Sequence, residues 1–267
     1  MSETEPRFVA RPPHKARHDH YWYCDALATE IPRLAEALAA TAPATEVVTC
    51  PGWTIADLAS HVGTVQRWAA AMVDRGSRER LRIRDLDLAK PADPAALPEW
   101  VAAGATSVVS TFRDADPDQP VWVWGADPHV RFWPRRMLYE SLVHRADAVL
   151  TAGDEPAVDA EMAIDGIEEL LDNLATAVSF SPSVAELRGA GETLHLHATD
   201  ADGEWTITLL PDGYEWDRAH TKATVALRGP AAELLLVLYR RRSPDSGRIT
   251  SFGEAALLEH WLANSAL

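Results

Sequence analysis

The sequence contains only two cysteines, Cys24 and Cys50, among its 267 residues. Two cysteines cannot make the disulfide framework on which small secreted domains depend, so we expect a cytoplasmic protein. No hydrophobic run approaches the roughly 20 residues that a membrane-spanning helix needs. The first residues, MSETEPRFVARPPHKARHDH, lack the apolar segment that follows the charged part of a secretory signal. These absences predict a soluble chain with no membrane partner.

Positive charge is also scarce. The chain has 25 lysines and arginines against 40 acidic residues, which gives a formal net charge of −15 at pH 7. A surface this acidic repels phosphate backbones and anionic lipids, so no nucleic acid partner is expected. The sequence has no GxGxxG, no P-loop and no GxSxG motif. Nucleotide-binding and serine-hydrolase chemistry therefore have no support.

The remaining composition, with 47% hydrophobic and 24% charged residues, is ordinary for a globular protein. Apolar residues recur at three-to-four spacing through the first two thirds of the chain, which is typical of amphipathic helices. This spacing predicts helices over about 19–40, 54–76, 94–113, 134–153 and 158–178. Thr54 is a good N-cap for the second of these, with Asp57 three residues further on, and Gly76 closes it.

The pattern changes to period two after about residue 190. The segments ETLHLHAT and EWTITLLP, joined by the turn DADGE, predict a hairpin, and KATVALRG predicts a third strand. Two helices are expected to follow, over 230–241 and 254–267. The predicted fold class is therefore α + α/β. We expect a disordered segment over 1–18, a helical bundle over 19–182 and a small α/β domain over 183–267.

Glu140 and His144 lie four residues apart on a predicted helix, so their side chains project from one face. His61 lies near the middle of another predicted helix, among apolar neighbours such as Leu58 and Val62. Two imidazoles and one carboxylate can hold a divalent cation and leave positions open for water or substrate. An exposed Glu–His ion pair and a core histidine bonded to a carbonyl are the alternative interpretations of the same residues.

Other polar residues give weaker signals. Asp147 follows His144 by three residues, where it can orient a ligand imidazole, although pairing with an arginine is the more common arrangement. His195 and His197 share one face of a predicted strand and could bind metal as a pair, but no third ligand is evident nearby. Cys24 has no obvious base partner in its helix.

Tryptophans gather around the proposed ligands in the sequence. Trp53 precedes the helix of His61, and the tract PVWVWGADPHVRFWP precedes the helix of Glu140 and brings Trp122, Trp124 and Trp133. Such residues are more often part of a core. Aromatic side chains before a ligand helix can also line a pocket for a cofactor or an apolar substrate.

Two segments, TCPGWTIADLASHVG and ESLVHRADA, resemble the N-terminal domain of the mycothiol-dependent maleylpyruvate isomerase family, which is related to DinB-like metal-binding bundles. LLPDGYEW, ATVALRGPAAELLLVLYRR and FGEAALLEHWL resemble the family's C-terminal domain, similar in fold to sterol carrier proteins. The resemblance covers roughly residues 20–265. It implies that His61, Glu140 and His144 hold Zn²⁺ or another divalent metal, that mycothiol is the thiol cosubstrate and that Cys50 is structural.

The resemblance also implies a role for Arg241, at the position of the family's arginine at the end of a C-terminal helix. Its guanidinium can clamp a carboxylate of the substrate or thiol. The sequence departs from the family pattern here, because Arg240 precedes it where a glycine is more usual and Arg242 follows. Arg240 and Arg242 therefore stay alternatives, as does a solvated basic helix end.

The function predicted from the resemblance is a zinc-dependent, mycothiol-using S-transferase acting on a small electrophile. A mycothiol-dependent maleylpyruvate cis–trans isomerase is the second possibility, since both reactions begin with thiol activation. The transferase is placed first because the family is large and because the N-terminus and the tryptophan-rich tract suggest a bulkier substrate. A small-molecule or metal binding protein, and an enzyme using another thiol or water, are further alternatives. A monomer or homodimer is expected.

Overall fold

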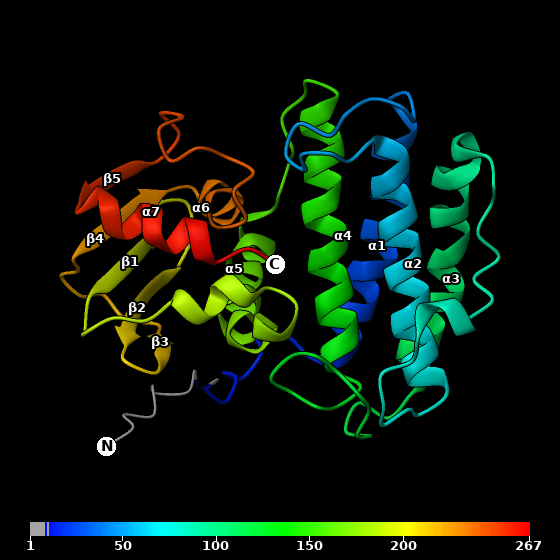
Figure 1. The fold of residues 1–267 in the computed structure, drawn as a ribbon, viewed down its shortest axis with the longest axis horizontal. Coiled ribbons are helices and arrows are strands. Elements are labelled where there is room, and N and C mark those ends of the chain that lie inside the picture. Colours follow the sequence, from blue (N-terminus) through cyan, green and yellow to red (C-terminus); the bar gives the residue numbers. More distant parts are fainter. Residues whose placement is uncertain (1–8, 10) are drawn as a thin grey trace, which may run out of the picture. The chain divides into compact units, whose positions relative to one another are not determined.

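The computed structural model describes Val9 and residues 11–267 (Figure 1). The chain forms two compact units. One unit, here called the helical unit, comprises residues 16–123 and 127–157. The other, the sheet unit, comprises residues 124–126 and 158–267 together with the described residues that precede Ala16.

The helical unit has four long helices, α1 His20–Ala39, α2 Ile55–Asp74, α3 Leu97–Asp114 and α4 Phe132–Thr151, and two short 3-10 turns, Ile83–Asp85 and Pro94–Ala96. Helices α1 and α2 each pack against both α3 and α4, as Figure 1 shows. The four helices predicted for this part of the chain are confirmed. Their buried faces carry apolar residues at helical spacing, for example Leu27, Ile31, Leu34 and Leu38 on α1.

The start of α2 is set by its own sequence. The Thr54 hydroxyl accepts from the backbone N–H of Asp57, and the Asp57 carboxylate accepts from the backbone N–H of Thr54 at 2.9 Å. This capping box satisfies two amide groups at the helix end, and it holds the helix that carries His61 in register with the preceding loop. Helix α4 begins two residues earlier than Pro134, which occupies its first turn.

The sheet unit contains five strands, β1 Thr193–Ala198, β2 Glu204–Leu210, β3 Gly213–Asp217, β4 Val225–Gly229 and β5 Thr250–Gly253. It also contains helices α5 Ala160–Leu174, α6 Ala231–Leu238 and α7 Ala255–Asn264, with 3-10 turns at Ala175–Ser179 and Pro182–Glu186. The strand order is β3-β2-β1-β4-β5. Strands β1 and β4 are parallel, and the other pairs are antiparallel.

The predicted hairpin and third strand are confirmed as β1, β2 and β4, whereas β3 and β5 were not predicted. In β3, Tyr214 and Trp216 are buried while Glu215 and Asp217 are exposed, an alternation that spans too few residues to have been recognised in the sequence. Strand β5 has the sequence TSFG, which shows no apolar alternation, and all four of its residues are exposed. Hydrogen bonds to β4, which the sequence does not reveal, make it a strand.

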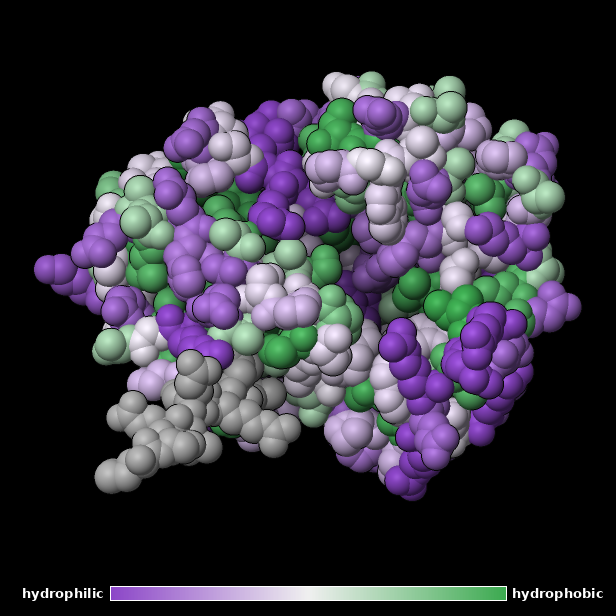
Figure 2. All heavy atoms as spheres, viewed as in Figure 1, coloured by the Kyte–Doolittle hydropathy of each residue, from purple (hydrophilic) through white to green (hydrophobic). Residues whose placement is uncertain are grey.

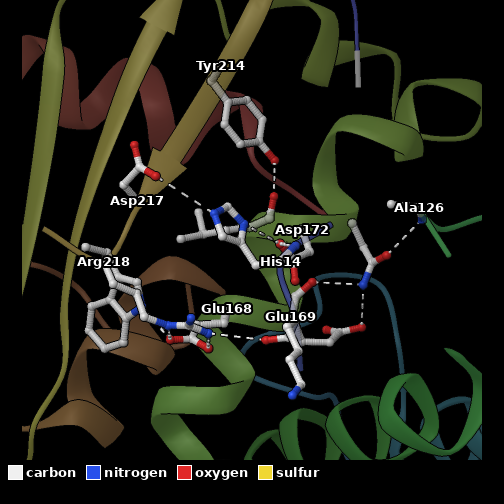
Figure 3. Close-up of polar contacts among 12 residues, drawn as sticks. His14, Ala126, Glu168, Glu169, Asp172, Tyr214, Asp217 and Arg218 are labelled. Carbon is white, nitrogen blue, oxygen red and sulfur yellow. Dashed lines mark hydrogen bonds and ion pairs between the residues drawn. The ribbon is translucent and has the colours of Figure 1, made fainter. Parts of the chain in front are cut away.

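Helix α5 belongs to the sheet unit, so the division lies near residue 158 rather than at the expected 182. Figure 3 shows the polar contacts that attach it: the Tyr214 hydroxyl donates to the carbonyl of Leu171 at 2.7 Å, and the Arg218 guanidinium pairs with Glu168. Trp205 Nε1 also donates to Glu168 at 3.3 Å. Side chains from β2, β3 and the loop after β3 thus bond directly to α5.

Of the segment expected to be disordered, residues 1–8 and 10 lie outside the described residues. The described residues that precede Ala16 belong to the sheet unit. Arg11 pairs with Asp212 at 3.1 Å, and the backbone N–H of His14 donates to the Asp172 carboxylate at 3.0 Å. Specific contacts of this kind fix the course of the chain there.

Among the described residues, none of the helices combines the length and the apolar character required to cross a lipid bilayer. On the face drawn in Figure 2, hydrophobic side chains appear as small groups among hydrophilic ones. Scattered apolar groups of this kind are ordinary for a globular protein surface.

Candidate metal centre

The three predicted ligands converge in the helical unit. His61 comes from α2, and Glu140 and His144 come from α4. His61 Nε2 lies 2.8 Å from Glu140 Oε1, and His144 Nε2 lies 3.4 Å from the same oxygen. One ligand atom from each residue lies within 4.8 Å of the other two. The α-helical spacing of Glu140 and His144 and the packing of α2 on α4 together produce this grouping.

The donor set and its spacing fit a divalent cation. Ligand atoms about 2.0–2.2 Å from a tetrahedral Zn²⁺ lie about 3.4 Å from one another. The separation of His144 Nε2 from Glu140 Oε1, 3.4 Å, matches this value, and that of His61 Nε2 from the same oxygen, 2.8 Å, is a hydrogen-bond distance that a cation would lengthen. Two neutral imidazoles and one carboxylate are also the ligand types that zinc and similar metals use in sites with an open position.

A buried hydrogen bond fixes α2 against α4 beside the three residues. Gln66 Nε2 donates to the Ser141 hydroxyl at 3.0 Å, and that hydroxyl donates to the carbonyl of Met137 at 2.7 Å. Both Gln66 and Ser141 are fully buried. Because Gln66 follows His61 by five residues and Ser141 follows Glu140 directly, this bond holds the two ligand helices in register.

Asp147 orients His144. Its Oδ2 lies 2.7 Å from His144 Nδ1, and the carboxylate is fully buried. A proton on Nδ1 that is shared with a carboxylate leaves Nε2 with the lone pair that a cation needs. From the sequence, both this contact with His144 and a pairing of Asp147 with an arginine were possible.

Asp147 also anchors the loop that precedes α2, which the sequence did not reveal. The Thr49 hydroxyl donates to its Oδ1 at 2.5 Å, and Cys50 Sγ lies 3.4 Å from its Oδ2. A single buried carboxylate therefore joins the ligand helix to the loop that carries Trp53. Cys50, His144 and Asp147 themselves form a second group of closely spaced ligand atoms on the other side of the imidazole.

Arg136 is a further residue of the site that the sequence analysis missed. It lies one turn before Glu140 on α4, is buried, and its Nη2 lies 3.4 Å from Glu140 Oε2. The contact leaves Oε1 of the same carboxylate directed to His61 and His144. The i,i+4 spacing of Arg136, Glu140 and His144 is a signal that could have found it.

The side chains of the centre strongly shift one another's pKa. Burial alone would raise the pKa of Glu140, but hydrogen bonds with His144 and His61 and the charge of Arg136 hold it well below its usual value. Burial would lower the pKa of His144, but hydrogen bonds with Asp147, Cys50 and Glu140 raise it well above the usual value. Without a metal, the centre therefore keeps an ionised carboxylate next to a protonated imidazole, and a cation can replace that proton.

Trp53 covers part of the centre. Its ring centroid lies 5.0 Å from that of His61 and 6.2 Å from that of His144, on which it is stacked. The side chain of His61 nevertheless remains 33% exposed and that of Glu140 20% exposed. The centre thus has an aromatic wall and a side open to solvent.

The other tryptophans do not form a common wall with Trp53. Trp122 and Trp133 pack against Trp68, each with ring centroids 5.5 Å away, and Trp133 Nε1 donates to the carbonyl of Trp122. Trp124 belongs to the sheet unit, where its ring lies 5.2 Å from that of Phe180. The tryptophan-rich tract is therefore divided between the two units, and of its three tryptophans only Trp133 is fully buried.

Arg241 lies in the sheet unit, just after α6. Its backbone N–H donates to the carbonyl of Leu236 at 2.7 Å, and Arg240 has a left-handed conformation with φ +61°. This is the Schellman arrangement that ends many helices, and its left-handed position favours glycine. Arg240 thus has the conformation expected of the glycine in the family pattern, and Arg241 takes the position of the arginine that follows that glycine. Arg242 pairs with Glu233 at 3.0 Å.

Comparison with known proteins agrees with this architecture. The model of the mycothiol maleylpyruvate isomerase N-terminal domain matches residues 24–149, and the model described as MDMPI C-terminal domain matches residues 161–260. Together they cover most of the chain. No curated protein matches.

Two solved structures share the fold. A crystal structure of the mycothiol-dependent maleylpyruvate isomerase superposes with a TM-score of 0.58 at 16% identity, covering 89% of this chain and 95% of that one. A mutant of that isomerase, with one histidine replaced by alanine, gives 0.57 at 15% identity with the same coverage. These likenesses confirm the predicted fold class, a helical region followed by a small mixed-sheet domain. The two family models show that the chain belongs to the mycothiol-dependent maleylpyruvate isomerase family.

Proposed function

We propose that the chain is a metal-dependent S-transferase that joins the thiol of mycothiol to a small electrophilic substrate. The observation that carries the proposal is the convergence of His61 Nε2, Glu140 Oε1 and His144 Nε2 in a site that is open on one side. A divalent cation such as Zn²⁺ held by these three atoms supplies the positive charge that lowers the pKa of a thiol. The group of Cys50, His144 and Asp147 is the weaker candidate, because its carboxylate is already bonded to Thr49 and to the imidazole.

The residues of the centre have separate tasks in this proposal. Asp147 keeps the Nε2 lone pair of His144 directed to the centre, and Arg136 fixes the orientation of the Glu140 carboxylate. With one carboxylate and two neutral imidazoles, the ligand set cancels only one of the two charges of the cation. The Trp53 ring limits the access of water from one side. In the transfer, the thiol loses its proton to solvent and its sulfur forms a bond to the electrophilic carbon, while the bond from that carbon to the leaving group breaks and the leaving group departs with the electron pair.

We also propose that Arg241 binds a carboxylate of the thiol or of the substrate. A guanidinium offers two parallel N–H donors to a carboxylate, which gives both affinity and orientation. The left-handed conformation of Arg240 supports this assignment, because it aligns Arg241 with the arginine that follows the family's glycine.

Maleylpyruvate isomerisation is the second candidate, and the similarity to the isomerase structure over 89% of the chain favours it. In that reaction the sulfur adds across a conjugated cis double bond, rotation occurs about the resulting single bond, and elimination gives the trans product. The burial of Trp133 and the packing of Trp122 on Trp68 remove one argument for a bulkier substrate. Both reactions share the addition of the thiol to an electrophilic carbon.

The test uses purified protein reconstituted with zinc. The protein is incubated with mycothiol and a panel of electrophiles and, separately, with mycothiol and maleylpyruvate. Free thiol is measured in both, and maleylpyruvate and fumarylpyruvate are measured in the second. We expect metal-dependent loss of free thiol with at least one electrophile and loss of this activity in His61→Ala. Conversion of maleylpyruvate to fumarylpyruvate at constant thiol would instead establish the isomerase. Metal binding without turnover of either kind would overturn the proposal.

A further inference from the structure

A second group of histidines lies in the sheet unit. In the antiparallel pairing of β1 and β2, His195 is opposite Thr206 and His197 is opposite Glu204. Alternate residues of a strand point to the same face, so all four side chains share one face of the sheet. The sequence showed the two histidines but not their partners on β2.

The third histidine comes from the loop between β3 and β4. The Thr206 hydroxyl donates to the carbonyl of Ala219 at 2.9 Å and lies 2.8 Å from the Thr221 hydroxyl. Both neighbours of His220 are therefore tied to one side chain of β2, directly above the strand pair. This anchoring places the His220 imidazole over the same face as His195 and Glu204.

The imidazoles surround one carboxylate. His220 Nδ1 lies 2.9 Å from Glu204 Oε1, and His197 Nδ1 contacts the same oxygen. The ring centroids of His195 and His220 are 5.1 Å apart with the rings nearly perpendicular. One ligand atom each of His195, Glu204 and His220 lies within 4.8 Å of the other two.

His195 provides an independent sign of a missing partner. Its side chain is buried, with the residue only 6% exposed, and its Nε2 makes no hydrogen bond within the described part of the chain. Buried polar atoms in proteins almost always have a partner, so such an atom calls for a bound ligand or water. A cation bound by the imidazole satisfies the histidine without any other protein group.

We propose that His195, Glu204 and His220 form a second divalent-metal site, with His197 holding the Glu204 carboxylate in place. Two imidazoles and a carboxylate suit a first-row transition metal such as Zn²⁺. The three ligand atoms lie within 4.8 Å of one another, and around one tetrahedral ion their separations would be about 3.4 Å. His220, whose side chain is 73% exposed on a loop, can make the movement that this requires. The site shares no residue with the centre formed by His61, Glu140 and His144, and does not depend on the function proposed for it.

The test measures zinc bound by the full-length, untagged chain, with a chromophoric chelator as competitor. The background is His61→Ala with His144→Ala, which removes the centre of the helical unit. We expect this variant to bind one Zn²⁺ per chain, and the further change His220→Gln to abolish binding at micromolar zinc. His197→Gln should weaken binding roughly tenfold, as expected for a residue that orients a ligand. His129→Gln is the matched control, because His129 also contacts a carboxylate, that of Asp127.

The outcomes separate the two sites. The second site is overturned if the background variant binds zinc fully and still does so after both His220→Gln and Glu204→Gln. It is also overturned if the background variant binds no zinc. Two ions in the wild type and one in the background variant support both sites. If the wild type and the background variant each bind one ion that His220→Gln removes, the second site stands and the centre in the helical unit fails. Circular dichroism of each variant identifies any loss of folding.

Discussion

His144 Nδ1 lies 2.7 Å from Oδ2 of the fully buried Asp147, one turn further along α4. The same carboxylate accepts from Thr49 and contacts Cys50, so it connects the ligand helix to the loop before α2. This arrangement makes Asp147 the residue on which the tautomer and the orientation of His144 depend. Its buried charge contacts polar side chains of the centre and of that loop.

Asp147→Asn should therefore weaken zinc binding by roughly 10- to 100-fold, the effect typical of losing a carboxylate that orients a ligand histidine. The amide keeps the size of the side chain but removes its charge, so the proton is no longer held on Nδ1 of His144. Competition with a chelator measures the affinity. Asp154→Asn, an exposed position just after α4, is the control. An unchanged affinity in Asp147→Asn would show that another residue orients the imidazole.

Zinc affinity at this centre should rise with pH. Hydrogen bonds with Asp147, Cys50 and Glu140 outweigh the effect of burial and raise the pKa of His144 well above its usual value. Below that raised pKa the imidazole carries a proton that the metal must displace, so affinity should grow about tenfold per pH unit for each displaced proton. The rise should continue above pH 7 and level off as pH passes the raised pKa. Chelator competition at several pH values checks this, and a flat profile between about pH 6 and 8 would contradict it.

Gly63 lets α2 approach its neighbour closely just after His61. A Cβ at this position would lie 2.2 Å from an atom of the Trp100 ring on α3, far inside contact distance. Gly63→Ala should therefore reduce the free energy of unfolding by about 1–3 kcal/mol, because the ring is packed and must shift. Urea unfolding followed by tryptophan fluorescence measures the change. Thr64→Ala, at the next position, is the control and should cost less. Equal stability of Gly63→Ala and wild type would mean that the helices can separate freely.

The parts of the fold that local chemistry determines were predictable from the sequence. Thr54 and Asp57 predicted the start of α2, and the helical spacing of Glu140 and His144 placed two candidate ligands on one face. His61 was a candidate because it lies among apolar residues on a predicted helix, but only the resemblance to a known family favoured its joining the other two, because no local pattern links α2 to α4.

Features that depend on contacts between distant segments were missed. Helix α5 was assigned to the wrong unit because only the folded chain brings Tyr214 to Leu171 and Arg218 to Glu168. Likewise, His220 is 23 residues from His197 and reaches it only because Thr206 holds the loop on either side. In both cases the decisive bonds join residues that no periodicity relates.

Arg240 and Arg241 should respond in opposite ways to substitution. Arg240 has φ +61°, a conformation that is strained for a residue with a Cβ and natural for glycine. Arg240→Gly should therefore raise the free energy of unfolding by about 1 kcal/mol and leave activity unchanged. Thermal unfolding and the thiol assay test the two halves of this expectation. A loss of activity in Arg240→Gly would mean that the side chain of Arg240, rather than that of Arg241, meets the substrate.

Arg241→Ala should keep the bound metal and lose activity. Hydrogen bonds to charged groups contribute about 1.5–3 kcal/mol, so losing the two-point contact with a carboxylate should lower kcat/KM roughly 10- to 100-fold. Arg242→Ala, which removes the pair with Glu233, is the matched control and should leave kcat/KM near that of wild type. Arg241→Lys separates charge from geometry: a lysine keeps the positive charge but not the parallel donors, so only partial recovery is expected. If Arg242→Ala lost activity and Arg241→Ala did not, the family arginine would lie one residue later than the Schellman geometry of α6 indicates.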